Sequence, residues 1–199
     1  MPTPQSWIAS TYGGLARLLS TSDKDLWDAP SLCAGWSVRH VVAHVTMPVR
    51  LSPAQFGAEL ATAGGDFTLL SDTVAARDAA LPVADLLGQL RSSELSAWRP
   101  PGGGAEGALS HAVIHSLDVT IPLEEVAVAP GEAVTAVLDR LTDVDGAVFG
   151  TVLTGMRLEA TDTDWQWGEG RPVRAEAGGL VALLSGRSLP DGRCLPRTP

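Results

Sequence analysis

Two pairs of histidines carry the chemistry that this sequence offers most clearly. His111 and His115 lie four residues apart in "SHAVIHSLD", and His40 and His44 have the same spacing in "RHVVAHV". The chain contains 4 histidines, so these two pairs use all of them. On a helix, residues i and i+4 lie on one face with Cβ atoms about 5–6 Å apart, so two imidazoles can bind one metal ion. The spacing therefore predicts a metal site, with a third ligand supplied by a histidine on a facing helix.

The neighbours of the histidines indicate which of them face the core. His44 follows "VVA" and His115 follows "AVI", so both lie among apolar residues. His40 lies one turn nearer the start of its helix, so it is expected to contact a ligand, to serve as a fourth ligand or to be exposed. Asp118 lies three residues after His115, where its carboxylate could orient the imidazole by accepting a hydrogen bond. The alternative for Asp118 is a carboxylate on the helix surface or at a cap.

The sequence around the two pairs predicts helices joined by short connections. Apolar residues recur at steps of three and four, and Ser, Pro and Gly stand where helices would start and stop. We expect helices over 5–20, from Ser37 to about Pro48, over 52–61, 67–98 and 105–121, and from about Pro130 onward. Short connections favour antiparallel neighbours, so four or five of these helices are expected to form a bundle.

The pattern changes after residue 150. "GMRLEATDTDWQW" contains alternating apolar residues, and "GEG" at 168–170 is typical of a turn, so we expect a β-hairpin or two short strands. A short apolar helix over 178–187 and a C-terminal tail follow. We therefore predict a mainly α protein with a helical domain over 1–150 and a small α/β segment over 151–199.

Composition limits the partners of the protein. Acidic residues outnumber basic ones, 23 to 14, and the net charge of −9 argues against a nucleic-acid partner. No run of 18 apolar residues is present, so no segment is expected to span a membrane, and no signal peptide is recognised. Cys33 and Cys194 form no CxxC motif, which favours reduced thiols in the cytoplasm, although Cys33 could also approach the metal. A homodimer is possible, but no motif specifies it.

Three segments resemble a known family. "DAPSLCAGWSVRHVVAHV", "HAVIHSLDVTIPL" and "GMRLEATDTDWQWGEGRPVRAEAGGLVALLSGR" resemble the signatures of the mycothiol-dependent maleylpyruvate isomerase family, part of the DinB-like superfamily. The resemblance implies an up-and-down four-helix bundle with a small C-terminal α/β cap. It also implies a divalent metal, usually zinc, held by His44, His111 and His115. The maleylpyruvate isomerase itself is expected to have a larger C-terminal domain than residues 151–199 provide.

The resemblance implies mycothiol as the thiol cosubstrate of an enzyme. Three protein ligands leave one position of a zinc ion open, and a thiol bound there loses its proton. The metal-bound thiolate would attack a small electrophilic substrate, which describes a mycothiol transferase or isomerase. Side chains that could bind a substrate carboxylate or wall the pocket, but could equally be surface or core residues, are Arg171, Arg174, Arg187, Trp36, Trp165 and Trp167.

Two other functions fit the same residues. A zinc-dependent hydrolase would use metal-bound water of lowered pKa to attack an amide or ester. A non-catalytic zinc-binding regulatory module would bind the metal without turnover. A thiol requirement separates the three, because only the transferase or isomerase needs an added thiol.

Overall fold

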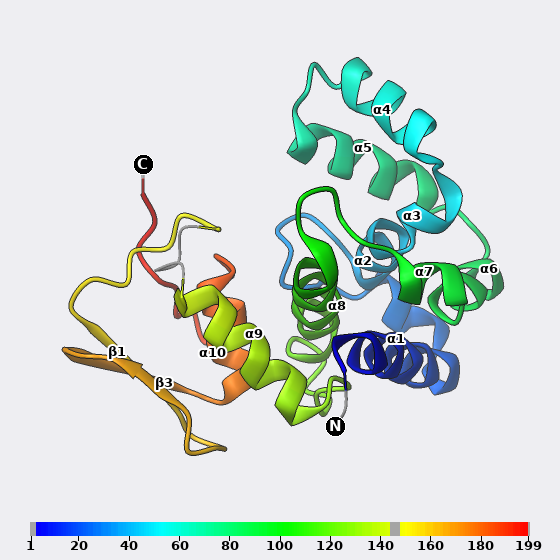
Figure 1. Cartoon of the computed structure of the whole chain (residues 1–199). Coiled ribbons are helices and arrows are strands. Elements are labelled where there is room, and N and C mark those ends of the chain that lie inside the picture. The colour runs from blue at the N-terminus through cyan, green and yellow to red at the C-terminus, as the bar shows by residue number, and fades with distance from the viewer. Residues whose placement is uncertain (1–2, 144–147, 199) are drawn as a thin grey trace.

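A computed structural model describes residues 3–143 and 148–198 of the chain (Figure 1). Helices fill the chain up to residue 143, and a small sheet and one more helix follow. The helices are α1 (Pro4–Thr21), η1 (Lys24–Asp28), α2 (Val38–Val45), α3 (Met47–Arg50), α4 (Pro53–Thr62), α5 (Phe67–Asp78), α6 (Val83–Leu90), α7 (Ser93–Ala97), α8 (Gly104–Thr120), α9 (Gly131–Asp143) and α10 (Ala177–Leu184). The strands are β1 (Met156–Ala160), β2 (Gln166–Gly168) and β3 (Arg171–Ala175).

Helix α8 lies at the centre of the molecule, where it contacts α1, α2, α9 and α10 (Figure 1). It is apolar around most of its circumference, as expected of a helix that is packed on several sides. A Cβ added to Gly178 of α10 would lie 2.9 Å from a methyl group of Leu117, so α10 and α8 pack closely because residue 178 is glycine. The predicted mainly α fold with a small C-terminal cap is confirmed.

Local sequence sets the start and end of α2. Ser37 begins the helix by a capping box, in which its own side chain accepts from a backbone N–H and the His40 side chain accepts from the Ser37 N–H. The helix ends at Val45, and α3 begins at Met47 with Pro48 in its first turn, because proline has no N–H to continue the preceding helix. The predicted break near Pro48 is confirmed.

Helix was predicted over 67–98, with Pro82 in a first turn, and the structure divides this helical segment. The segment forms α5, α6 and α7, separated by turns. Pro82 stands at the N-cap of α6, and the Ser92 side chain accepts a hydrogen bond from the Leu95 N–H to start α7. Apolar residues keep a helical spacing on both sides of each turn. This spacing alone therefore does not show where one helix ends and the next begins.

The C-terminal cap is a three-stranded sheet with strand order β2-β1-β3. β1 and β2 form the predicted antiparallel hairpin, in which Leu158 lies opposite Trp167. The sequence did not predict β3, which pairs with β1 in the parallel direction. The predicted C-terminal tail instead packs back on the domain: the Val152 N–H donates to the Pro196 carbonyl at 2.8 Å, and Leu195 is buried.

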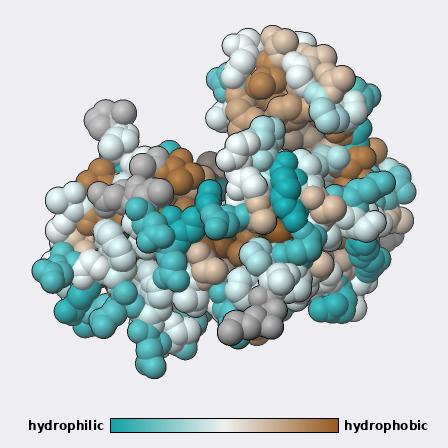
Figure 2. Space-filling view, in the orientation of Figure 1, coloured by the Kyte–Doolittle hydropathy of each residue, from teal (hydrophilic) through white to brown (hydrophobic). Residues whose placement is uncertain are grey.

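Two apolar clusters organise the interior. The larger one includes Leu117 of α8, Leu138 of α9 and Leu180 of α10, so the core crosses the domain boundary predicted at residue 150. The smaller one joins Met47 of α3 to Leu70 and Val74 of α5. We call residues 47–78, which contain α3, α4 and α5, the α3–α5 arm; α5 contacts α2, and α4 and α5 project at the top of the molecule, where the visible surface carries apolar residues (Figure 1 and Figure 2). Among the described helices, none is long and apolar enough to cross a membrane.

Candidate metal centre

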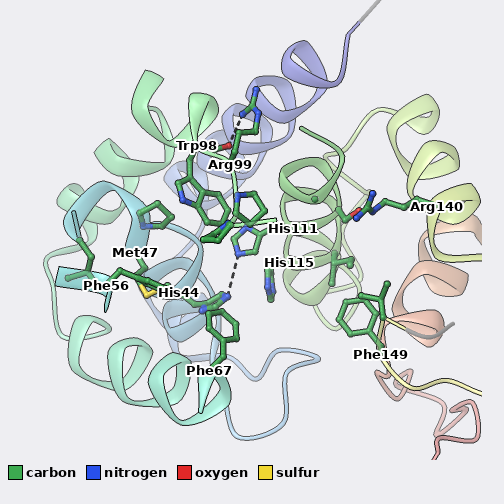
Figure 3. Close-up of a pocket in the computed structure, with 18 of the residues that line it drawn as sticks. His44, Met47, Phe56, Phe67, Trp98, Arg99, His111, His115, Arg140 and Phe149 are labelled. Carbon is green, nitrogen blue, oxygen red and sulfur yellow. Dashed lines mark hydrogen bonds between the residues drawn. The ribbon is translucent and has the colours of Figure 1, made fainter. Parts of the chain in front are cut away.

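Three of the four histidines converge between α2 and α8 (Figure 3). His44 comes from the last turn of α2, and His111 and His115 come from successive turns of α8. The centroid of the His44 ring lies 5.3 Å from that of His111 and 4.8 Å from that of His115. The centroids of the His111 and His115 rings lie 4.7 Å apart. The Nε2 atoms of His44 and His111 are 3.4 Å apart. One ring nitrogen of each histidine lies within 4.8 Å of the other two.

The remaining ring nitrogens of the two α8 histidines have their own partners. Nδ1 of His115 lies 2.9 Å from a carboxylate oxygen of Asp118, which can only accept, so the proton of this ring stays on Nδ1. Nδ1 of His111 lies 3.1 Å from the hydroxyl oxygen of Tyr12 on α1. Both contacts fix the ring orientation and leave Nε2 to face the centre of the three rings, as in metal sites built from histidine.

The electrostatics of the site favour neutral imidazoles. Burial and the neighbouring His115 lower the pKa of His44 to about 3, and burial lowers the pKa of His111 well below its ordinary value. Neutral rings are the form that binds a metal ion. His44 Nδ1 is buried and has no hydrogen-bond partner among the described residues.

The spacing of the nitrogens fits a tetrahedral metal ion. Two nitrogens that each lie 2.0–2.1 Å from one zinc lie about 3.3 Å from each other. The observed separation between the Nε2 atoms of His44 and His111 is 3.4 Å. The donor set and this one separation suit zinc, and metal binding by the three residues stays a prediction.

Asp118 joins the histidines to the C-terminal part of the chain. Its side chain is 1% exposed and accepts hydrogen bonds from Arg187 Nε at 2.8 Å and Nη2 at 2.9 Å. The Cys33 thiol also donates to it, at 3.0 Å. Burial raises the pKa of Asp118, but the hydrogen bonds from His115 and Arg187 outweigh burial and hold that pKa well below its usual range. We call these four residues (Cys33, His115, Asp118 and Arg187) the Asp118 cluster.

Cys33 is a hydrogen-bond donor in this cluster rather than a thiolate. Burial raises the pKa of its thiol, and the negative charge of Asp118 raises it further. Arg187 Nη2 lies 3.4 Å from the sulfur, but this cation does not reverse the direction of the shift. The sequence left open whether Cys33 approaches the metal site, and the structure places it beside Asp118.

Several predicted site residues lie apart from the three histidines. His40 caps α2 through Ser37, 2.8 Å from its hydroxyl. The exposed residues Arg171 and Arg174 lie on β3, where Arg174 pairs with Glu159. Trp36 is closer: its ring lies 5.1 Å from that of His44. Other predicted pocket residues that pack against the core are Trp165 and Trp167.

A cavity of about 680 Å³ opens beside the three histidines. Arg187 lines it, as the sequence suggested, but most of the lining was not predicted. Residues that the sequence did not single out are Trp98, Arg99, Arg140, Phe149 and the apolar side chains of the α3–α5 arm (Figure 3). Tyr12 was also missed; as the only tyrosine, placed on a buried helix face, its hydroxyl needed a partner and was a usable signal.

Comparisons with known proteins agree with the geometry. Residues 11–102, which include His44, match the family described as Mycothiol maleylpyruvate isomerase N-terminal domain. Two solved structures resemble the chain: the crystal structure of a histidine-to-alanine mutant of the mycothiol-dependent maleylpyruvate isomerase (TM-score 0.56, 15% identity) and that of the mycothiol-dependent maleylpyruvate isomerase (TM-score 0.50, 17% identity). No curated protein matches the chain significantly.

The two structural matches span nearly the whole chain. Each covers 98% of this chain and 95% of the other chain. The expectation that the maleylpyruvate isomerase has a larger C-terminal domain than residues 151–199 stays a prediction. At this level of identity the likeness establishes the fold.

Proposed function

We propose that the chain is a metal-dependent enzyme of the mycothiol maleylpyruvate isomerase family, whose N-terminal domain residues 11–102 match, and that it uses mycothiol to isomerise or substitute a small electrophilic substrate. The observation that carries the proposal is the convergence of His44, His111 and His115 beside an open cavity. These residues would hold a divalent metal, zinc in our proposal, which supplies a Lewis acid that lowers the pKa of a thiol.

The chain's own residues would prepare this site in two ways. Asp118 keeps the proton of His115 on Nδ1, and Tyr12 holds His111 from the opposite side, so both rings present Nε2 to the cavity. No Asp or Glu lines the described part of the cavity, so no carboxylate there is available as a base. The proton of the thiol would therefore leave through the cavity to solvent.

The substrate chemistry follows from a sulfur nucleophile. The sulfur forms a C–S bond with an electrophilic carbon, and the displaced electron pair moves onto the substrate. In an isomerisation of a conjugated double bond, the adduct rotates about the resulting single bond. The returning electron pair then restores the double bond and expels the sulfur, so the thiol is regenerated. In a transfer, a leaving group departs with the electron pair instead.

The test is a spectroscopic titration of cobalt-substituted protein with mycothiol. A sulfur-to-cobalt charge-transfer band should appear with the unmodified chain and with His40→Ala, and should be absent from His115→Ala. No uptake of cobalt or zinc by the unmodified chain would refute the metal site. Metal uptake without the band, together with turnover of an ester or amide in thiol-free buffer, would support a hydrolase instead.

A further inference from the structure

The α3–α5 arm gives the cavity an apolar wall. Its six lining side chains all come from a short stretch of sequence: Met47, Pro48, Leu51, Pro53, Phe56 and Phe67. The rings of Phe56 and Phe67 lie 6.4 Å apart, and Figure 3 shows both, with Met47, on the side of His44. None of the six carries a charge or a hydrogen-bonding side chain, so this wall can contribute only apolar contacts to a ligand.

Two of the three arginines that line the described cavity already have partners for their cationic groups. Arg187 donates from Nε and Nη2 to Asp118, and from Nη1 to the Ser185 carbonyl at 3.1 Å. Arg99 donates from Nη1 to the Trp98 carbonyl at 2.6 Å and from Nη2 to the side-chain oxygen of Gln5. The charge of Arg187 is therefore already paired with a carboxylate, whereas Arg99 bonds to neutral oxygens.

The third arginine lies across the cavity from the arm. Arg140, labelled in Figure 3, belongs to α9, and it pairs with Glu106 of α8 at 2.8 Å. The pair is at the solvent-exposed edge, since the two side chains are 35% and 75% exposed. Arg99, Ser110 and Arg140 also line the cavity, and none of them belongs to the arm. They suit the hydroxyls and amides of a polar cosubstrate.

We infer that the electrophile is an uncharged, largely apolar molecule, aromatic or aliphatic, which packs against the α3–α5 arm. This inference rests on the proposed function, because it names the class of the second substrate. A carboxylate placed against the arm would lose its hydration without gaining an ionic partner. An apolar group placed there gains buried area against six apolar side chains, in a cavity of the size that small-molecule ligands occupy.

The inference is tested by binding to the full chain with EDTA present, so that no ligand registers by coordinating a metal. The neutral fluorescent probe N-phenyl-1-naphthylamine reports occupancy, and methyl cinnamate, cinnamate and maleate compete with it. We expect the ester to displace the probe at a concentration about ten-fold lower than cinnamate does, and maleate to fail. Displacement by cinnamate or maleate at an equal or lower concentration would overturn the inference, as would absence of probe binding.

A matched pair of variants locates the binding wall. Phe67 and Leu69 both lie in the first turn of α5 and are 54% and 53% exposed, but only Phe67 lines the cavity. An aspartate in the first turn of a helix is favourable, so Phe67→Asp and Leu69→Asp should both fold, which thermal unfolding verifies. We expect Phe67→Asp to weaken probe binding about ten-fold and Leu69→Asp to change it less than about two-fold.

Equal effects of the two variants, or no effect of Phe67→Asp, would show that the arm is not the wall that binds the probe. These measurements need neither metal nor mycothiol. If the probe experiments fail, the apolar site is refuted, and the cobalt titration still tests the proposed function. If the cobalt titration fails, the proposed function is refuted, and the probe experiments still test the apolar site.

Discussion

Asp118→Asn tests whether one buried carboxylate holds the site together. The substitution keeps the shape of the side chain and removes its charge. Asp118 is 1% exposed and accepts from His115, Arg187 and the Cys33 thiol. In the variant, Arg187 keeps its positive charge in a position where its side chain is only 20% exposed. The variant therefore leaves a largely buried cation without its counter-ion.

The expected cost follows from this burial. Removing one partner of a buried ion pair destabilises a protein by about 3–5 kcal/mol. Arg187 retains some contact with water, and the asparagine oxygen still accepts one hydrogen bond, so we expect a loss of about 2–3 kcal/mol. Arg187→Met should cost at least as much, because it leaves the deeper charge of Asp118 unpaired. The double variant removes both charges and should recover at least about 2 kcal/mol of the summed losses.

The assay is urea unfolding of metal-free protein, analysed as a double-mutant cycle over these two positions. If the two single losses add within about 0.5 kcal/mol, Asp118 and Arg187 do not form the coupled pair described above. A second readout is zinc affinity, measured by competition with a chromophoric chelator. Asp118→Asn should weaken it by about ten- to a hundred-fold, because a neutral amide oxygen accepts the His115 Nδ1–H more weakly than a carboxylate does, which makes the His115 imidazole a poorer metal ligand. Unchanged zinc affinity would refute that role for Asp118.

Three further predictions concern the histidines. His40→Ala should keep zinc binding, measured by elemental analysis, and cost about 1 kcal/mol in urea unfolding, because it removes one half of the α2 capping box. Tyr12→Phe should weaken zinc binding about ten-fold without loss of folded protein by circular dichroism, because His111 Nδ1 loses its partner. The free energy of unfolding of the metal-free protein should fall as the pH drops from about 6.5 towards 3, because unfolded His44 takes up a proton near pH 6.5 and folded His44 only near about pH 3. His44→Gln should flatten this fall.

The elements that local sequence determines could be predicted closely. The helix expected over 105–121 is α8 (Gly104–Thr120), because its apolar run and the glycines before it are local signals. The β1–β2 hairpin was also predicted, from two short apolar runs, but the predicted turn at 168–170 lies between β2 and β3. The parallel pairing of β3 with β1 was not predicted, because it depends on the tertiary path of the chain between the two strands. In addition, Pro172 lies within β3, and proline makes a segment look less like a strand.

The part of the candidate site that lies on α8 could be predicted from the sequence. Spacing alone places His111 and His115 on one face of α8, and adds Asp118 one turn later. The approach of His44 depends on how α2 packs against α8, and spacing did not decide between His44 and His40; the apolar neighbours of His44 did. Arg187 joins the cluster from 69 residues further along the chain, and the sequence named it only together with Arg171 and Arg174.

The division of the cavity between two parts of the chain has a functional consequence. The histidines and Asp118 lie on α2 and α8, inside the main core, where a substitution disturbs many packed neighbours. The apolar wall belongs to the α3–α5 arm, which has a small apolar cluster of its own and whose Phe67 is half exposed. Substitutions in the arm can therefore change the shape and polarity of the wall at little cost in stability. If the electrophile packs against the arm as we propose, its identity can vary through the arm while the histidines and the Asp118 cluster stay as they are.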